Sequence, residues 1–346
     1  MNYMYLITYG TRPELIKLFP LINKMKELGI EHKTLFTGQH KDLILEFENL
    51  THKPDFVLEN IMEHGQSINA LISKIINQSQ KVFNKLDCKV IVQGDAASTF
   101  ALALSGFNNN KEVIHLEAGL RTYNIQSPFP EEGFRKMISQ ISTTHLCPTK
   151  RSVENLKNEK ILENVYLVGN TIVDSCEYIL NNGKISIELE NIIQKNHPYY
   201  LCTLHRRENI NNFKEMWSQL NEISKNKTIL YIKHPSVPDA KNYLSKSIIQ
   251  LDPLSYQDMI YAIKFSDGII SDSGGLQEEA ICLEKNILIC RDTSERPETI
   301  ESGYGLLVGK KIKENIKFLE NKSKKIINNN PYGANVIDKV IDVLID

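Results

Sequence analysis

Short runs of apolar and β-branched residues alternate with longer stretches of helical periodicity along nearly the whole chain. A strand is predicted at residues 4–8, and a helical pattern follows it through residue 28. Strands that alternate with helices form βαβ units, whose parallel sheet is covered by helices on both faces. The alternation therefore predicts an α/β protein built on parallel sheets.

The same pattern repeats in both halves of the chain. In the first half, strands are predicted at residues 4–8, 32–36, 56–58, 89–92, 112–116, 143–147 and 165–168. In the second half, they are predicted at residues 199–204, 228–232, 268–271 and 286–290. The polar stretch 181–196, rich in Asn, Lys and Glu, is the predicted domain boundary. The last segment, 335–345, is an apolar-periodic helix that could pack on either domain.

The length and composition agree with a globular protein of two domains. At ~150 residues per domain, the 346 residues make about two domains. The chain has 41 Lys and Arg and 42 Asp and Glu, so its charges nearly balance. There is therefore no strongly positive field for non-specific nucleic-acid binding. The six cysteines form no Cys-x-x-Cys pair, which favours buried thiols in a reducing compartment. Without a signal peptide or ~18 consecutive apolar residues, the protein is expected to be cytoplasmic, with no membrane partner.

Polar clusters follow the predicted strands, where open α/β sheets place their functional loops. The sequence Gly-Thr-Arg-Pro-Glu at residues 10–14 ends the first strand and opens a helix, with Pro13 suited to its first turn. That helix N-terminus, with Arg12 and Lys17, is a candidate anion site. A surface turn with solvated charges is the alternative. The glycine patterns of dinucleotide-binding and P-loop proteins are both absent here.

A second cluster has the form Asp-Ser-Gly-Gly and follows a predicted strand of the second half. The small residues Ser273, Gly274 and Gly275 let backbone N–H groups approach a phosphate closely. One helical turn further, Glu278 and Glu279 can accept hydrogen bonds from ribose hydroxyls. This combination suits a nucleoside diphosphate, although a bare Ser-Gly-Gly is more often only a turn.

Carboxylates also follow strands of the first half. Asp95 and Glu117 come after two strands that are expected to be neighbours, and Glu131 and Glu132 lie further on. Carboxylates that converge on one site can shift each other's pKa and divide acid and base roles. Helix caps, solvated charges and ion pairs are the alternatives, since an arginine lies four residues after both Glu117 and Glu131.

His205 follows a predicted strand and precedes two arginines. A histidine in that place can contact a phosphate or act as an acid, and a structural histidine at a sheet edge is the alternative. No two histidines have the spacing of metal ligands, and no serine lies in a nucleophile elbow. No metal site is therefore expected.

These motifs resemble those of the non-hydrolysing UDP-N-acetylglucosamine 2-epimerases over nearly the full chain. The similar stretches follow the family order and are residues 10–14, 37–40, 94–95, 115–122, 127–132, 169–171, 205–209, 272–279, 291–298 and 330–333. The resemblance implies two Rossmann-like domains that face a central cleft (GT-B-like), with the C-terminal helix crossing back to the first. It implies a sugar and acid/base domain at 1–180, a UDP-binding domain at 181–330 and a helix at 331–346.

The resemblance also implies an isomerase that interconverts UDP-N-acetylglucosamine (UDP-GlcNAc) and UDP-N-acetylmannosamine (UDP-ManNAc), usually as a homodimer and without a cofactor. Residues at the family's catalytic positions are Asp95, Glu117, Glu131 and His205. Residues that suit substrate binding are Arg12, Lys17, Arg135, Ser273, Gly274, Gly275, Glu278 and Glu279. Gln39, His40 and Arg207 resemble parts of a second UDP-GlcNAc site, which promotes closure in family members regulated by substrate.

The epimerisation of C2 explains why the reaction needs both carboxylates and groups that stabilise a diphosphate. The proton on C2 of the sugar is not acidic, because no carbonyl flanks that carbon within the ring. Loss of UDP gives oxocarbenium character at C1 and acidifies C2, so the enzyme must stabilise the diphosphate and place a carboxylate at C2. Elimination yields a 2-acetamidoglucal and UDP, and re-addition with protonation from the other face inverts C2. Closure of the cleft excludes water.

The sequence departs from the family pattern at several positions. Phe134 stands where the family has Asn, which is expected to put an aromatic ring near the sugar pocket. Residues 96–99 read Ala-Ala-Ser-Thr in place of a threonine run, and residues 234–238 replace a His-x-Asn-Pro loop. These changes leave the exact sugar open.

Four alternatives to the leading interpretation differ in chemistry. A hydrolysing 2-epimerase would release free N-acetylmannosamine, but such enzymes tend to begin with Gly-Ser-Arg-Ala-Glu, and this chain has Gly-Thr-Arg-Pro-Glu. A 2-epimerase could instead act on a modified UDP-2-acetamido sugar. A glycosyltransferase would share the fold but need an acceptor. A catalytically silent UDP-sugar sensor would not need the carboxylates.

Overall fold

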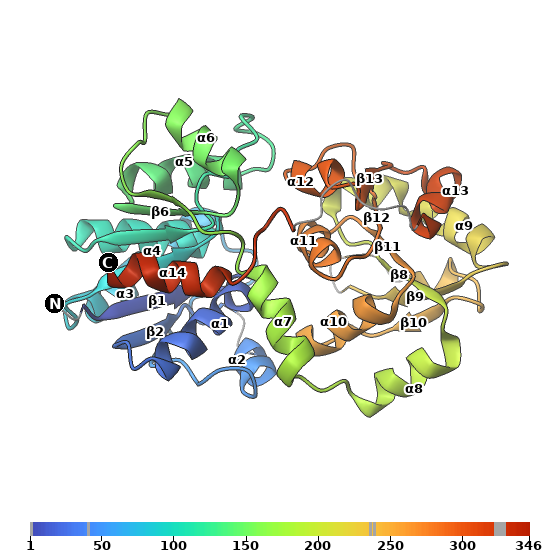
Figure 1. Cartoon of the computed structure of the whole chain (residues 1–346), viewed down its shortest axis with the longest axis horizontal. Coiled ribbons are helices and arrows are strands. Elements are labelled where there is room, and N and C mark those ends of the chain that lie inside the picture. Colours follow the sequence, from blue (N-terminus) through green and yellow to red (C-terminus); the bar gives the residue numbers. More distant parts are fainter. Residues whose placement is uncertain (1–2, 40–41, 235–236, 238–239, 322–329) are drawn as a thin grey trace. The chain divides into compact units, whose positions relative to one another are not determined.

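The chain forms two compact units in the computed structural model, which describes residues 3–39, 42–234, 237, 240–321 and 330–346. The first unit combines Met1–Ser175 with Tyr332–Asp346, and the second comprises Cys176–Pro331. Each unit is a parallel sheet with helices packed on it (Figure 1). The predicted α/β class is therefore confirmed.

The first unit holds a sheet of seven parallel strands in the order β3-β2-β1-β4-β5-β6-β7. The strands are β1 (Tyr5–Tyr9), β2 (His32–Phe36), β3 (Phe56–Val57), β4 (Lys89–Gln93), β5 (Val113–Leu116), β6 (Thr144–Cys147) and β7 (Val165–Leu167). Strands β4 and β5 are hydrogen-bonded neighbours in the register Val90↔Val113 to Gln93↔Leu116. The predicted adjacency of the strands that precede Asp95 and Glu117 is thus confirmed.

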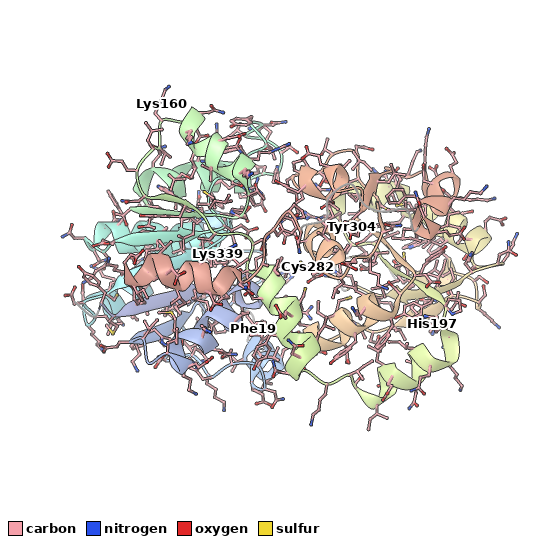
Figure 2. All side chains as sticks on the ribbon, in the orientation of Figure 1. Phe19, Lys160, His197, Cys282, Tyr304 and Lys339 are labelled. Atoms are coloured by element: carbon pink, nitrogen blue, oxygen red, sulfur yellow. The ribbon has the colours of Figure 1, made fainter. Side chains whose placement is uncertain are left out.

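Helices cover this sheet on both faces, as parallel strands require. They are α1 (Arg12–Glu27), α2 (Asp42–Phe47), α3 (Ile68–Phe83), α4 (Ala97–Asn108), α5 (Glu131–Ile141), α6 (Lys150–Asn158) and α14 (Val336–Ile345). Residues of α3, α4 and α5 form one apolar cluster with β1, β2, β4 and β5. On α1, Phe19 (labelled in Figure 2) is fully buried, and its ring packs against that of Phe47 of α2.

The C-terminal helix α14 belongs to the first unit and contacts α1. Tyr5 donates a hydrogen bond to the carbonyl of Leu344, and the Lys24 ammonium lies 3.2 Å from the Asp338 carboxylate. The apolar periodicity of this helix is explained by that packing, since Val340 is fully buried. Figure 1 shows α14 beside the elements of the first unit.

The second unit holds a sheet of six parallel strands in the order β10-β9-β8-β11-β12-β13. The strands are β8 (Tyr199–Thr203), β9 (Thr228–Ile232), β10 (Ile249–Leu251), β11 (Gly268–Ser271), β12 (Ile287–Ile289) and β13 (Gly305–Leu307). The α-helices are α8 (Ile187–Asn196), α9 (Phe213–Ile223), α10 (Tyr256–Phe265), α11 (Gly274–Cys282), α12 (Pro297–Glu301) and α13 (Ile312–Asn315). The short 3-10 helices are η1 (Arg207–Asn212), η2 (Ala240–Asn242) and η3 (Ile316–Glu320).

The division between the units lies inside α7 (Ile172–Asn182), between Ser175 and Cys176. The polar stretch 181–196 forms the end of α7 and the whole of α8, in the second unit. Among the described helices, none combines the length and the apolar character needed to cross a membrane.

Candidate active site

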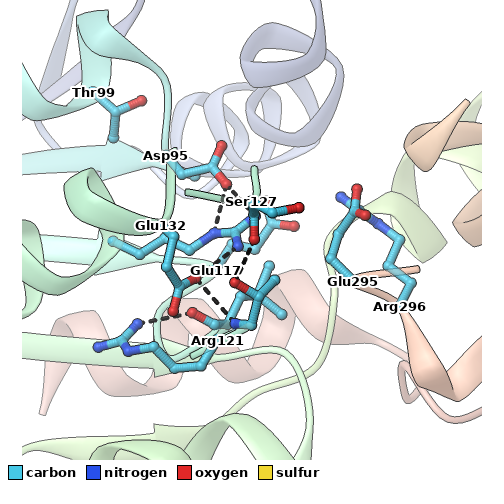
Figure 3. Close-up of polar contacts among 12 residues, drawn as sticks. Asp95, Thr99, Glu117, Arg121, Ser127, Glu132, Glu295 and Arg296 are labelled. Carbon is cyan, nitrogen blue, oxygen red and sulfur yellow. Dashed lines mark hydrogen bonds and ion pairs between the residues drawn. The ribbon is translucent and has the colours of Figure 1, made fainter. Parts of the chain in front are cut away.

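Two carboxylates of the first unit stand at the carboxyl ends of strands, and a third begins a helix. Asp95 lies in the turn after β4, Glu117 directly follows β5, and Glu131 is the first residue of α5. Because β4 and β5 are adjacent and parallel, the turns that carry Asp95 and Glu117 meet at one edge of the sheet. Figure 3 shows these two residues together with the polar contacts around them.

Glu117 is held at both oxygens by buried donors. The Lys17 ammonium lies 2.6 Å from Oε1, and the Gln93 side-chain amide donates to Oε2. The side chains of Lys17 and Glu117 are only 8% and 10% exposed. The backbone φ of Glu117 is 67°, in the left-handed region that residues with side chains seldom adopt. Glu117 therefore has a fixed position and a fixed cationic neighbour.

Asp95 is paired with Arg135 of α5. Both Nε and Nη2 of the guanidinium contact the same oxygen, Oδ2, at 2.8 and 2.7 Å. The Nη1 atom of Arg135 contacts Glu132 at 3.1 Å, and Glu132 also accepts the backbone N–H groups of Thr122 and Tyr123 (Figure 3). Within the described part of the chain, Arg135 thus contacts Asp95 and Glu132 and not Glu131, the ion-pair partner considered as an alternative from the spacing.

Glu131 differs from the other two carboxylates in its surroundings. Its Oε2 atom is buried, and within the described ranges it accepts no hydrogen bond. Arg121, the other arginine considered as an ion-pair partner, instead binds Glu159 with Nε and Nη2 at 2.8 and 2.7 Å. The site thus contains two carboxylates paired with cations and a third, Glu131, without such a described contact.

At the N-terminus of α1, the backbone donors bind the chain's own carboxylate. Glu14 accepts hydrogen bonds from the N–H groups of Gly10 and Thr11 at 2.9 and 2.6 Å, which is a capping box. Burial raises the pKa of Glu14, and a hydrogen bond from Thr99 opposes the rise. The predicted anion site at this turn is therefore filled by Glu14, while Arg12 pairs with Glu46 at 2.6 Å.

Gln39 packs against this same turn. A Cβ on Gly10 would lie 2.2 Å from Oε1 of Gln39 and 2.6 Å from Cβ of Ser98, so a larger residue would force these side chains to shift. Arg207 begins η1 in the second unit, but its side chain, like the whole of His40, lies outside the described residues. The predicted second site stays a prediction.

In the second unit, Asp272 organises the loop after β8. Its buried carboxylate accepts the backbone N–H groups of His205 and Arg206 at 2.9 and 3.0 Å, and the Asn209 side-chain amide at 2.9 Å. The His205 ring stacks on His234, with 4.7 Å between ring centroids. Burial lowers the pKa of His205, and Asp272 opposes part of that shift.

The Ser-Gly-Gly turn forms the N-terminus of α11, as the sequence predicts. The Ser273 hydroxyl caps the helix by accepting the N–H group of Leu276. A Cβ on Gly274 would lie 3.0 Å from Arg296 and Glu295, whereas a Cβ on Gly275 would meet nothing within 4 Å. Gly275 therefore presents open space at a helix N-terminus, where an anion is favoured.

An arginine–glutamate network surrounds this turn. Glu278 pairs with Arg296 at 2.7 Å, and Glu295 pairs with Arg291 at 2.6 Å and with Arg296 at 2.9 Å. Burial raises the pKa of Glu295, but Arg296 and Arg291 outweigh it and lower the pKa to about 2. Glu279 is buried nearby in α11. The sequence analysis assigns no role to Arg291, Glu295 and Arg296. They nevertheless follow β12, where functional loops are expected.

Phe134 lies in the core and not at the carboxylates. Its side chain is 6% exposed and stacks on Phe100 of α4, with 5.0 Å between the ring centroids. The expectation that Phe134 lines a sugar pocket is therefore corrected, because the ring fills the interface between α4 and α5. Among the described residues, no three His, Cys, Asp or Glu side chains are grouped to hold a metal ion.

Comparison with known proteins places the chain in a family. The family model described as UDP-N-acetylglucosamine 2-epimerase matches residues 23–345. The UDP-N-acetylglucosamine 2-epimerase of Campylobacter jejuni is 36% identical, over 98% of this chain and 97% of its own.

Solved structures give the same relationship. The UDP-GlcNAc 2-epimerase of Neisseria meningitidis bound to UDP-GlcNAc has a TM-score of 0.88 and 33% identity, and 99% of each chain is covered. The Methanocaldococcus jannaschii UDP-GlcNAc 2-epimerase, in complex with UDP-GlcNAc and UDP, has a TM-score of 0.86 and 31% identity, again over 99% of each chain. This chain belongs to the UDP-N-acetylglucosamine 2-epimerase family.

Proposed function

We propose that this protein is a non-hydrolysing 2-epimerase that interconverts UDP-GlcNAc and UDP-ManNAc. The observation that carries the proposal is the set of three carboxylates in the first unit, of which Asp95 and Glu117 follow adjacent strands. Proton transfer at a carbon needs positioned carboxylates, whereas a protein that only binds a UDP-sugar does not. Membership of the family supports the same substrate pair.

The chemistry divides into leaving-group stabilisation and proton transfer. In the second unit, the N-terminus of α11 at Ser273, Gly274 and Gly275 is proposed to bind the diphosphate through backbone N–H groups. His205, in the loop after the neighbouring strand β8, is proposed to donate to the leaving phosphate. Glu278 is proposed to accept a ribose hydroxyl, since its ion pair with Arg296 fixes its orientation.

The first unit is proposed to supply the carboxylates that transfer the proton at C2 of the sugar. A carboxylate removes the C2 proton as the C1–O bond breaks, and the electrons of the C2–H bond form the double bond of a 2-acetamidoglucal. UDP then returns to C1 while a second carboxyl group protonates C2 from the other face. Lys17 is proposed to act on Glu117, because its ammonium contacts that carboxylate, and Arg135 is proposed to orient Asp95.

The wider biological setting belongs to the proposal as well. A cytoplasmic homodimer, no organic cofactor and a place in the synthesis of surface polysaccharide precursors are proposed from the family resemblance. A regulatory second UDP-GlcNAc site at Gln39, His40 and Arg207 is proposed on the same basis.

Proton and phosphorus NMR of the purified protein with UDP-GlcNAc alone tests the proposed function. Formation of UDP-ManNAc, with no free sugar, is the expected result. Accumulation of free N-acetylmannosamine and UDP would replace the proposal with a hydrolysing epimerase. No conversion of UDP-GlcNAc would contradict it and leave a modified sugar or a silent binder.

A further inference from the structure

We propose that Gln93 is a positioning residue which, together with Lys17, holds Glu117 as a fixed anion in the active site. This inference rests on the proposed 2-epimerase function and deepens it. It gives Glu117 an electrostatic role and leaves proton transfer at C2 to Asp95 and Glu131.

The position of Gln93 is set by the sheet. It is the last residue of β4, it is 1% exposed, and its register partner on β5 is Leu116, the residue before Glu117. The Thr99 hydroxyl lies 2.8 Å from the Gln93 carbonyl and 2.6 Å from Glu14, two acceptors that share its one proton, and it links the strand end to α4. The Gln93 side-chain amide therefore reaches Glu117 from a rigid support, as a positioning group must.

The contacts of Glu117 favour its ionised form. One oxygen meets the Lys17 ammonium at 2.6 Å, and the other accepts the Gln93 amide. Hydrogen bonds to a carboxylate and a nearby positive charge both stabilise the charged state. A carboxylate engaged at both oxygens is also a weak base, so it is poorly suited to remove a proton from carbon.

The backbone around Glu117 is arranged to permit this geometry. Glu117 has φ of 67°, and Gly94, directly after Gln93, has φ of 75°. A Cβ on Gly94 would lie 3.6 Å from Oε2 of Glu117, which is ordinary contact. Residues with side chains rarely adopt a positive φ, and those that do concentrate at functional sites, where surrounding structure enforces the conformation.

The stereochemistry of the reaction explains why one carboxylate of three is held in this way. Inversion at C2 through a planar intermediate needs two proton-transfer groups, one for each face of the ring. Asp95 meets Nε and Nη2 of Arg135 with Oδ2, and its Oδ1 is proposed to carry the proton. Glu131 has no described cationic contact. The anion at Glu117 then faces the positive charge that develops at C1 as UDP leaves.

Gln93→Met tests this role, because methionine keeps the shape of glutamine and removes its hydrogen bond. We expect kcat for UDP-GlcNAc to fall about 10- to 100-fold, the effect of one hydrogen bond to a charged group, while KM changes less than about twofold. Thr8→Val is the matched control, since the buried Thr8 hydroxyl donates to the Ile91 carbonyl at 3.0 Å in the same sheet. The control is expected to lose similar stability and to keep its kcat.

Gln93→Glu supplies a second test that does not depend on the folding of the methionine variant. A protonated carboxyl at this position can still donate to Glu117, but an ionised one repels it. The activity of Gln93→Glu relative to the wild type is therefore expected to fall as the pH rises from about 5 to 8, with melting temperatures measured in parallel.

Two results would overturn the inference. One is a kcat for Gln93→Met equal to that of the Thr8→Val control, and the other is a pH-independent activity ratio for Gln93→Glu. Both comparisons require a wild type that converts UDP-GlcNAc to UDP-ManNAc, so an inactive wild type contradicts the proposed function instead.

Discussion

At the scale of single residues, Asp95 carries the most direct catalytic prediction. Asp95→Asn removes the base and its charge but keeps the size of the side chain, and Arg135 retains its contact with Glu132. We expect kcat to fall about 10²- to 10⁴-fold, the usual contribution of a positioned general base. The dissociation constant of UDP, measured by titration calorimetry, should remain within about twofold of the wild-type value. The residues proposed to bind the diphosphate lie in the second unit. Unchanged turnover would remove Asp95 from the mechanism.

Two buried histidines make stability depend on pH. Burial lowers the pKa of His145 to about 4 and that of His115 to about 3, although a hydrogen bond between His115 and the Gly94 carbonyl opposes the shift at His115. Since the unfolded chain binds these protons below pH ~6.5 and the folded chain does not, stability is complete above that pH and falls as the pH drops towards 4.

His145→Gln checks this dependence. Between pH 5 and 6, each such histidine contributes about 1.4 kcal/mol per pH unit to the slope of the unfolding free energy. Urea unfolding of His145→Gln should therefore show a slope smaller by roughly that amount. The exposed His64→Gln is the control and should keep the wild-type slope. Equal slopes for the two variants would contradict the assignment.

At the scale of elements, a substitution at the N-terminus of α11 should change UDP affinity without weakening the fold. A methyl group on Gly275 meets nothing within 4 Å, so Gly275→Ala should fold normally and gain about 0.4–1 kcal/mol of stability. The same methyl group occupies the approach to the backbone donors. We expect UDP affinity to fall about tenfold or more, which is ~1.4 kcal/mol or more. Wild-type affinity in titration calorimetry would exclude this turn as the diphosphate site.

A substitution at the interface between α4 and α5 tests whether Phe134 serves the core and not the sugar pocket. Phe134→Leu leaves a gap against Phe100, so we expect a loss of about 1 kcal/mol or more in unfolding free energy. KM for UDP-GlcNAc should not change, since the ring lies in the core. Phe107→Leu, at a position 53% exposed on α4, is the control and should leave the stability unchanged. An altered KM with wild-type stability would return Phe134 to the sugar pocket.

At the scale of the whole molecule, the sequence predicts the helices and strands better than it predicts which charged side chains form ion pairs. The alternation of strands and helices, and the positions of Asp95 and Glu117 after adjacent strands, could be predicted because apolar periodicity records which faces are buried. The sequence does not predict strands β10 and β13, which have three residues each and lie at the edges of their sheet.

The pairing of charges could not be read from the sequence. Lys17 contacts Glu117, which lies 100 residues away, and Arg135 contacts Asp95, which lies 40 residues away. Such pairs depend on strand order and on the facing of helices, which local spacing does not encode. The ion pairs considered from a spacing of four residues, Glu117 with Arg121 and Glu131 with Arg135, both differ from the pairs in the structure.

Solvent deuterium at C2 is the most direct test of the central claim, that carboxylates of the first unit exchange a proton with the sugar. The wild type, incubated with UDP-GlcNAc in D2O, should give UDP-ManNAc with deuterium at C2, observed by proton NMR as loss of the C2 signal. Asp95→Asn should form this product at least about a hundredfold more slowly. Formation of UDP-ManNAc that keeps the original C2 proton would contradict proton exchange with solvent through these carboxylates.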